Sequence, residues 1–256
     1  MFHLSPVLAD EHPLKPRAAY VLALGARYLL RNLPLAEKLL AEALVLMDGS
    51  PAAGLLLASG LGYSTLLQYS EVLLQQEKTK YGILSYYACA STLRLQHHRT
   101  KHFEILSRTA STAATQHHTK KAICYYRDLL ESYVAQKKTN EIVYVSEKIG
   151  EMYSDLGKFQ HAISYLLTAI GTLPQESRDE RCQKLLFKVA QVYLKSYDVD
   201  KGIKILQYMA SNLTNDRRAE CLKILASVYC KEQKYIECEE CLGILESEQR
   251  ATTERS

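Results

Sequence analysis

Four of the seven cysteines fall close together near the C-terminus, where their thiols could bind a metal ion. They are Cys221, Cys230, Cys238 and Cys241, and the spacing Cys238-x-x-Cys241 is that of one edge of a zinc site. Structural zinc sites usually have two such close pairs, whereas this segment has one. A buried thiol can also act as a small apolar side chain in a core. We therefore favour core cysteines over a zinc site.

The histidines give a second candidate metal site. His98 and His102 lie four residues apart and would share one face of a continuous helix. Arg94, Arg99 and Lys101 lie around them and would repel a cation. No carboxylate or thiolate completes the set of ligands. We expect a solvated corner between two elements here, without a metal.

Motifs for nucleotide and hydrolase chemistry are absent from the sequence. It has no phosphate-binding G-x-x-x-x-G-K-[ST] loop, no G-x-S-x-G elbow and no H-E-x-x-H zinc motif. Gly60-Leu61-Gly62 is a glycine pair without the third glycine or the preceding strand of a dinucleotide-binding loop. We therefore expect a protein that is not an enzyme and has no catalytic, cofactor or metal site.

The composition is that of an ordinary folded protein. Of its 256 residues 47% are hydrophobic and 23% are charged, and 11 Gly and 6 Pro are few enough to favour helices. The first residues, MFHLSPVLADEH, lack the basic lead and apolar run of a secretory signal. We expect reduced thiols and a cytoplasmic location, with the nucleus as an alternative.

One long uncharged stretch requires a check for membrane insertion. No residue between Asp48 and Glu71 is charged, but the stretch contains Pro51, Gly54 and Gly60 together with several polar residues. A membrane-spanning helix needs about 20 predominantly apolar residues. The stretch instead indicates a loop followed by a buried helix, so we expect no membrane span.

An internal repeat organises most of the chain. Its clearest copy runs from Val143 to Pro174, VYVSEKIGEMYSDLGKFQHAISYLLTAIGTLP. Gly150 and Ala162 would let two antiparallel helices approach closely, Gly157 would relax the turn between them, and Pro174 would end the second helix. The positions equivalent to Gly150 are residues 25, 70, 110, 150, 190 and 226, whose successive differences are 45, 40, 40, 40 and 36. Such regular spacing indicates a stack of helical hairpins.

This pattern resembles the tetratricopeptide repeat family. The shared positions are Ile149-Gly150, Tyr153, Gly157, Ala162, Leu166, Ala169 and Pro174, while Ser146 stands where the family has tryptophan. The period is closest to the 40-odd-residue variety of kinesin light chains and Pins-type adaptors, or to the hairpins of alpha-SNAP. The resemblance implies an all-α, right-handed solenoid of about six antiparallel helix pairs over residues 18–246. We expect an extended N-terminal segment over residues 1–17 and a polar, flexible tail over residues 247–256.

In this family the first helix of each pair lines a concave groove that binds a partner. The resemblance therefore implies a partner-binding groove lined by Tyr144, Glu147, Glu151, Ser154, Asp155, Lys184, Phe187, Gln191, Lys195, Glu220, Lys223, Ser227 and Lys231. A groove that is acidic in the middle and basic toward the C-terminus suits a protein or peptide partner of mixed charge. The asparagines of the family's carboxylate clamp are absent, at Ser107, Ser111 and Lys148, so we do not expect that kind of ligand.

A basic segment precedes the proposed groove. Residues 94–138 hold nine Lys and Arg against three acidic residues, a net charge of +6. This exceeds the net charge of +4 for the whole chain. We take seven of them as a candidate basic patch: Arg94, Arg99, Lys101, Arg108, Lys120, Lys121 and Arg127. It could contact an acidic protein, a phospholipid surface or RNA, or be only a solvated face. No ladder of aromatic residues accompanies it, which makes nucleic acid an unlikely partner.

Two functions therefore remain open. The chain could be an adaptor that binds a peptide or helix in its groove. It could also be a structural subunit, or an oligomer, held in a larger complex through its ends and its basic outer face. No separate polar helix follows the last predicted hairpin. The end of a helical stack normally needs such a polar cap, so its absence would favour the second function.

Overall fold

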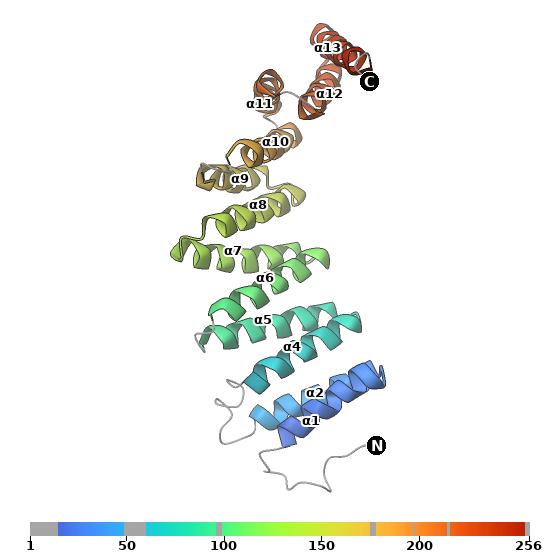
Figure 1. Cartoon of the computed structure of the whole chain (residues 1–256), viewed down its shortest axis with the longest axis vertical. Helices are drawn as coiled ribbons and strands as arrows, with labels where there is room; N and C mark the ends of the chain where they lie inside the picture. Colours follow the sequence, from blue (N-terminus) through green and yellow to red (C-terminus); the bar gives the residue numbers. More distant parts are fainter. Residues whose placement is uncertain are drawn as a thin grey trace. The chain divides into compact units, whose positions relative to one another are not determined.

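The computed structural model describes residues 15–48, 60–95, 99–174, 178–196, 198–213 and 216–253. Its helices are α1 (Lys15–Leu24), η1 (Gly25–Leu29), α2 (Leu33–Asp48), α4 (Gly60–Gln75), α5 (Thr79–Leu95), α6 (Arg99–Thr115), α7 (Thr119–Ala135), α8 (Thr139–Asp155), α9 (Phe159–Thr172), α10 (Arg178–Lys195), α11 (Val199–Asn212), α12 (Asp216–Lys231) and α13 (Tyr235–Thr253) (Figure 1). These residues contain no strand, so the all-α prediction is confirmed.

By their order along the chain, the described helices make six successive pairs, in each of which we call the first helix A and the second helix B. The chain divides into two compact units, residues 1–129 and residues 130–256, and the boundary falls within α7. In unit 1, α1 packs on α2 and α4 packs on α5, and the B helices α2 and α5 contact the A helices that follow them, α4 and α6. In unit 2, the pairs α8–α9, α10–α11 and α12–α13 are joined in the same way. The predicted repeat is therefore present.

Helices A and B cross most closely at a pair of small residues. In the fourth pair, a methyl group added to Gly150 would lie 2.8 Å from Cγ of Leu166 and 3.2 Å from the carbonyl oxygen of Ala162. Ala162 and Leu166 are fully buried, with exposed fractions of 0% and 1%. The sequence prediction that Gly150 and Ala162 permit a close approach is thus confirmed.

The same crossing occurs in other pairs with the glycine on the opposite helix. A methyl group on Gly82 of α5 would lie 3.2 Å from the carbonyl oxygen of Ser70 on α4. A methyl group on Gly202 of α11 would lie 3.1 Å from the carbonyl oxygen of Ala190 on α10. The two residues of each crossing are twelve positions apart, as Gly150 and Ala162 are. One small residue from each helix at this spacing sets the distance between A and B.

The first pair departs from this pattern. A methyl group on Gly25 would meet nothing within 4 Å, so Gly25 is not the residue of closest approach that we expected. Ala23, Ala26 and Ala36 instead form the buried contact. Gly25 begins the π-helical turn η1, which adds a residue to helix A and shifts the register of the pair.

The turns between A and B use a left-handed residue. Gly157 has a φ of +70°, as its position in the repeat predicted. The A–B turns of three other pairs place non-glycine residues in the same region: Glu77 (61°), His117 (59°) and Gln233 (61°). Lys137 (56°) does so in the turn from the B helix α7 to the A helix α8. After the fourth pair, α9 ends at Thr172, two residues before Pro174, in agreement with the expected stop.

The domain limits need two corrections. Helix α1 begins at Lys15 rather than at residue 18, and α13 continues to Thr253, so residues 247–253 extend the last helix instead of forming a tail. Residues 1–14 and 254–256 of the two expected terminal segments lie outside the described residues.

The second half of the uncharged stretch between Asp48 and Glu71 forms most of the helix α4. Thr65 and Ser70 are buried, and their hydroxyl groups donate to the carbonyl oxygens of Leu61 and Leu66. Among the described helices, none has both the length and the hydropathy needed to cross a membrane. The loop expected over residues 49–59 lies outside the described part of the chain.

Helix α13 carries acidic residues where a following repeat would pack. In the fourth pair, Ile163 and Ile170 of α9 belong to the core that α9 shares with α10. The equivalent positions of α13 hold Glu239 and Glu246, both exposed, on either side of Leu242. This outer face is therefore more polar than the equivalent face of α9, although no separate helix follows α13 within the described residues.

We predict that Gly150→Ala lowers the free energy of unfolding by about 1–3 kcal/mol, because the added methyl group forces Leu166 out of a fully packed position. Gly243→Ala is the matched control, since Gly243 lies within α13 and a methyl group there meets nothing within 4 Å. The control should gain up to about 1 kcal/mol from helix propensity. Denaturant titration of both variants gives the comparison, and equal gains would refute the close crossing.

Candidate functional site

The predicted groove residues occupy equivalent positions of the repeat on α8, α10 and α12 in unit 2. We call this set of exposed and half-exposed side chains the A-helix face. From α8 it includes Tyr144, Glu147, Glu151, Ser154 and Asp155; from α10, Lys184, Phe187, Lys188, Gln191 and Lys195; and from α12, Glu220, Lys223, Ser227 and Lys231. Ion pairs connect α8 to α10 and α10 to α12.

The first of these links joins α8 to α10. Lys188 donates hydrogen bonds to both Glu147 and Glu151, and Lys148 lies 2.8 Å from Glu151. Burial disfavours the charged form of Glu151, but hydrogen bonds from Lys148 and Lys188 outweigh this and lower the pKa of its carboxyl group. Burial also opposes the charge on Lys188, and its hydrogen bonds to Glu147 and Glu151 still raise its pKa. The predicted acidic centre of the groove is therefore neutralised within the protein.

A second link joins α10 to α12. Nη2 of Arg217 lies 3.1 Å from Oε1 of Glu180, and Nη1 of Arg217 donates to Oε1 of Gln183 at 3.3 Å. Lys184 also pairs with Glu180, at 2.8 Å. Lys184, which we expected to face a partner, is thus engaged within its own helix.

Several predicted groove residues have no such partner. Lys195, Lys223 and Lys231 are exposed and form no ion pair with any residue that the structure describes, and the same is true of Asp155. Tyr144 is 44% exposed. The face thus offers free cations toward α12 and an exposed aromatic ring on α8.

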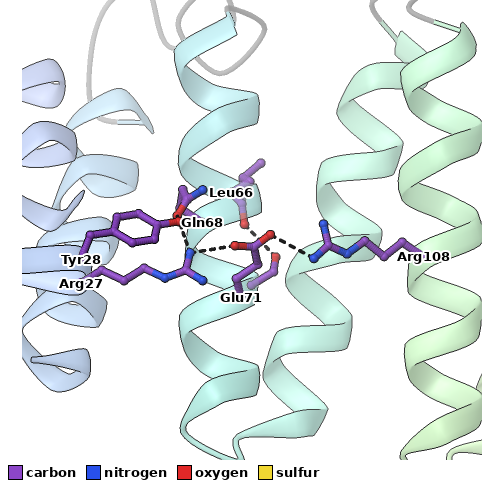
Figure 2. A network of polar contacts seen from close by, with 7 residues as sticks. Arg27, Tyr28, Leu66, Gln68, Glu71 and Arg108 are labelled. Atoms are coloured by element: carbon purple, nitrogen blue, oxygen red, sulfur yellow. Dashed lines mark hydrogen bonds and ion pairs between the residues drawn. The ribbon is translucent and has the colours of Figure 1, made fainter. Parts of the chain in front are cut away.

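Sequence reasoning missed a comparable network in unit 1. Glu71 on α4 accepts a hydrogen bond from Arg27 at 2.7 Å through one carboxylate oxygen and pairs with Arg108 at 3.1 Å through the other (Figure 2). Arg27 also donates to Gln68, which accepts a further hydrogen bond from Tyr28 at 3.3 Å. The Arg27 side chain is only 8% exposed, so its charge depends on Glu71. The sequence did contain one signal for this network: Glu71 is the first charged residue after Asp48, so it stands out as a lone charge at the end of an apolar stretch.

Both arginines of this network make cation–π contacts with tyrosine rings. The guanidinium carbon of Arg27 lies 4.9 Å from the ring centroid of Tyr28, and that of Arg108 lies 5.3 Å from the centroid of Tyr86. Burial raises the pKa of Tyr86 to about 12, although the positive charge of Arg108 opposes the shift. Tyr86 is therefore a neutral core residue at physiological pH.

The seven residues of the candidate basic patch do not gather in one place. Arg94 lies in the last turn of α5. Lys101 lies in the first turn of α6, and its ammonium group lies over the ring of Tyr63. Lys120 and Lys121 begin α7, after the opposite end of α6, and a 17-residue helix spans about 25 Å. Arg108 belongs to the Glu71 network, Arg127 is exposed on α7, and the side chain of Arg99 lies outside the described residues.

The candidate metal ligands are used in the core. His102 is buried, and its Nδ1 donates to the carbonyl oxygen of Ala90 at 2.7 Å, while His98 lies outside the described residues. Cys221, Cys238 and Cys241 belong to the buried cluster between α11, α12 and α13. Within the described chain, no group of three or more potential ligand side chains could hold a metal ion.

The expectation that all thiols are reduced is wrong for one pair. Cys230 and Cys238 form a disulfide between α12 and α13, with their Cα atoms 5.9 Å apart. Helix pairing brings the two residues together across the turn, a proximity that their spacing in the sequence does not reveal.

A surface hollow of about 490 Å³ has Ser196, His161 and Asp198 among its lining residues, which are the residue types of a hydrolase triad. Their hydrogen bonds are different from those of a triad. Oγ of Ser196 donates to the carbonyl oxygen of Tyr193 at 2.8 Å and accepts from the backbone N–H of Asp198 at 3.2 Å. The hydroxyl group is therefore committed to a turn and is not activated by the histidine.

Comparisons with known proteins place the fold. No protein-family model matches the chain, and no curated protein matches it either. Among solved structures, BtubC (BKLC) from P. vanneervenii has a TM-score of 0.53 and 14% identity over 96% of this chain and 93% of its own. A signal transduction ATPase with numerous domains and a tetratricopeptide repeat sensor, from Pyrococcus horikoshii, also has a TM-score of 0.53, at 16% identity. The alignment covers 96% of this chain but only 37% of that protein.

These matches show the fold: the chain is a stack of helical hairpins of the tetratricopeptide repeat type. The prediction made from the repeat pattern is therefore confirmed at the level of fold.

In unit 1, we predict that Glu71→Gln lowers the free energy of unfolding by about 1–3 kcal/mol, because it leaves the buried Arg27 without a counter-charge. Arg108→Gln should cost less than about 1 kcal/mol, since that side chain is 50% exposed. Chemical denaturation distinguishes the two variants. A larger loss for the Arg108 variant would show that the network is not organised around Arg27.

In unit 2, the carboxylate of Glu151 stabilises the fold above its ordinary pKa of 4.5, and this stabilisation is lost as the pH falls through the lowered value. The ammonium group of Lys188 stabilises it below its ordinary pKa of 10.5, and this is lost as the pH rises through the raised value. We predict that Lys188→Met costs about 1 kcal/mol between these limits and less outside them. Lys204→Met, at an exposed residue of α11, is the control and should show no such window. A deficit of the Lys188 variant that is independent of pH would contradict the ion network.

Proposed function

We propose that the chain is a non-enzymatic scaffold or adaptor that binds a segment of a partner protein on the A-helix face of unit 2. The observation that carries the proposal is the division of charge on that face. Glu147 and Glu151 are occupied by lysines of neighbouring helices, whereas Lys195, Lys223 and Lys231 are exposed and have no ion-pair partner among the described residues. Unpaired charges in equivalent rows are suited to recognition across an interface.

The same charges define the chemistry of the partner. Glu147 and Glu151 of α8 are paired with lysines, which leaves Asp155 and Glu220 as the exposed acidic residues of the face. Against them stand the exposed lysines Lys195, Lys223 and Lys231, so the mixed-charge groove expected from the sequence keeps an excess of exposed cations. A partner segment with carboxylates that meet Lys223 and Lys231 is therefore favoured over a basic one. Tyr144 provides an exposed aromatic surface for an apolar anchor at the other side of the face. An extended or helical segment that crosses three successive A helices fits this arrangement.

The alternative function, a structural subunit held through its ends and a basic outer face, receives less support. Glu239 and Glu246 make the outer face of α13 polar, and the basic residues of unit 1 lie at separate places instead of forming one patch. Exposed Ile236 on α13, at 74%, is the feature that still favours it.

The experiment is an affinity purification from cell extract with quantitative mass spectrometry of the bound proteins. We predict that the double variant Lys223→Glu/Lys231→Glu loses at least tenfold of one discrete partner, because each substitution replaces an attractive contact by a repulsive one. Lys204→Glu is the matched control, since Lys204 is an exposed lysine on the B helix α11. Binding in the wild type should also weaken as salt is raised.

Two results would contradict this function. If the control variant and the double variant retain the same partners in the same amounts, the A-helix face is not the binding surface. If the proteins lost are those that a substitution on α13 also removes, such as Ile236→Asp, the structural-subunit function is favoured instead.

A further inference from the structure

The disulfide partners Cys230 and Cys238 have very different surroundings. Cys230 lies in the last turn of α12 and is exposed, so a reagent in solution can reach it. Cys238 lies in the first turn of α13 and is only 5% exposed, within the core that α13 shares with α11 and α12. The pair therefore joins an exposed cysteine to a buried one across the turn between α12 and α13.

The proximity of the two cysteines follows from the repeat itself. In the second pair, a methyl group on Gly82 would lie 2.8 Å from Cγ of Leu74, eight residues earlier. In the fifth pair, a methyl group on Gly202 would lie 2.8 Å from Cδ2 of Leu194, again eight residues earlier. Cys238 and Cys230 occupy the same two positions in the sixth pair. The contact thus recurs at the crossings of the second and fifth pairs, and in the sixth pair it brings two sulfur atoms together.

We propose that Cys230 and Cys238 are a site of reversible thiol–disulfide exchange with a low-molecular-weight thiol and disulfide couple of the glutathione class. In the oxidising direction, the Cys230 thiolate attacks one sulfur of the small disulfide, forms a mixed disulfide and releases one small thiolate. Cys238 then gives its proton to solvent and attacks the Cys230 sulfur, which forms the protein disulfide and releases the second small thiolate. The protein loses two thiol protons and two electrons, and the small disulfide becomes two thiols. Reduction is the reverse sequence and also begins at a sulfur accessible from solvent.

The other described cysteines do not compete for this exchange. Burial raises the pKa of Cys89 to about 12 and that of Cys221 to about 11, and it also raises the pKa of Cys241. These thiols stay protonated and are poor nucleophiles at physiological pH. Cys124 is exposed and Cys182 is half-buried, but neither is bonded to a second cysteine. Cys230 is the exposed cysteine that has a second cysteine at the crossing.

The exchange acts on the last helix pair. The disulfide fixes α12 to α13 at the crossing where Ala226 and Cys238 are both buried. Without it, the pair loses its covalent link, and α13 carries exposed acidic residues on its outer side. Oxidation therefore stabilises this pair, and reduction loosens it. This consequence does not depend on whether the A-helix face binds a partner.

The test is a titration of the whole chain in buffers of increasing ratio of oxidised to reduced glutathione. After quenching and unfolding, free thiols are counted by the mass added by a maleimide reagent. Of the seven cysteines, seven should be labelled in the most reducing buffer, and this number should fall by two, to five, as the buffer becomes oxidising. Cys124→Ser is the matched control for an exposed thiol and should show the same loss of two. Cys230→Ser should lose none.

Two outcomes of the titration would overturn the proposal. Labelling that never falls below the full number would show that the two sulfurs do not form a bond under cellular conditions. Labelling that stays at five in the most reducing buffer would show a permanent structural disulfide.

The second measurement tests the effect on the helix pair. Thermal unfolding of the wild type in reducing and oxidising buffer should differ by roughly 4 °C or more in its midpoint. Cys230→Ser should unfold at one midpoint in both buffers, close to that of the reduced wild type. A wild type whose midpoint does not change while its thiol count does would show that the bond forms without controlling the last pair.

Discussion

The close approach of helix A to helix B at two small residues, twelve positions apart, is the contact on which the rest of the structure depends. Where Gly150 meets Ala162, no space remains for a methyl group, and the same holds at Gly82 and Gly202. This contact fixes how the large residues on either side, such as Leu166, fill the space within and between pairs. The spacing of the small residues also sets which positions of A and B face each other. The disulfide between Cys230 and Cys238 follows from the same geometry.

Charge is used in two ways on the A helices. Part of it joins neighbouring repeats: Glu71 connects Arg27 to Arg108 in unit 1, and Lys188 connects α10 to two glutamates of α8 in unit 2. These groups are half-buried, and their ion pairs satisfy them within the protein. The remaining charges, which include Lys223 and Lys231, are exposed and unpaired within the described chain. We propose that recognition rests on this second group, because exposed, unpaired charges are available to a partner.

The repeat made the fold predictable from the sequence, because small residues and turn glycines leave a periodic signal that does not depend on tertiary contacts. Gly150, Ala162 and Gly157 were identified on that basis, and the structure confirms their roles. The first pair was assigned wrongly at Gly25, since one extra residue in a π-helical turn changes the register without changing the composition. The left-handed residues at Lys137 and Gln233 were also missed, because only glycine marks such a turn in a sequence.

The site was harder to predict for a different reason. The repeat places Glu147, Glu151 and Lys223 on equivalent surfaces, but it does not say which charges reach across to the next helix. Pairing depends on side-chain reach between residues about 40 positions apart, such as Glu147 and Lys188, and no local pattern encodes it. The seven basic residues show the same limit, because a cluster in sequence became several separate places once the helices were antiparallel. The chemistry of the face therefore required the structure.

The measurement that tests the central claim most directly is site-specific photocross-linking in cell extract. A photoreactive amino acid is placed at Gln191, an exposed residue on the A-helix face, and separately at Lys204, an exposed residue on the B helix α11. We predict a covalent adduct with one discrete protein from position 191 and none with that protein from position 204. The same adduct from position 204 alone would contradict the account, because it would place the partner on the opposite helix of the pair.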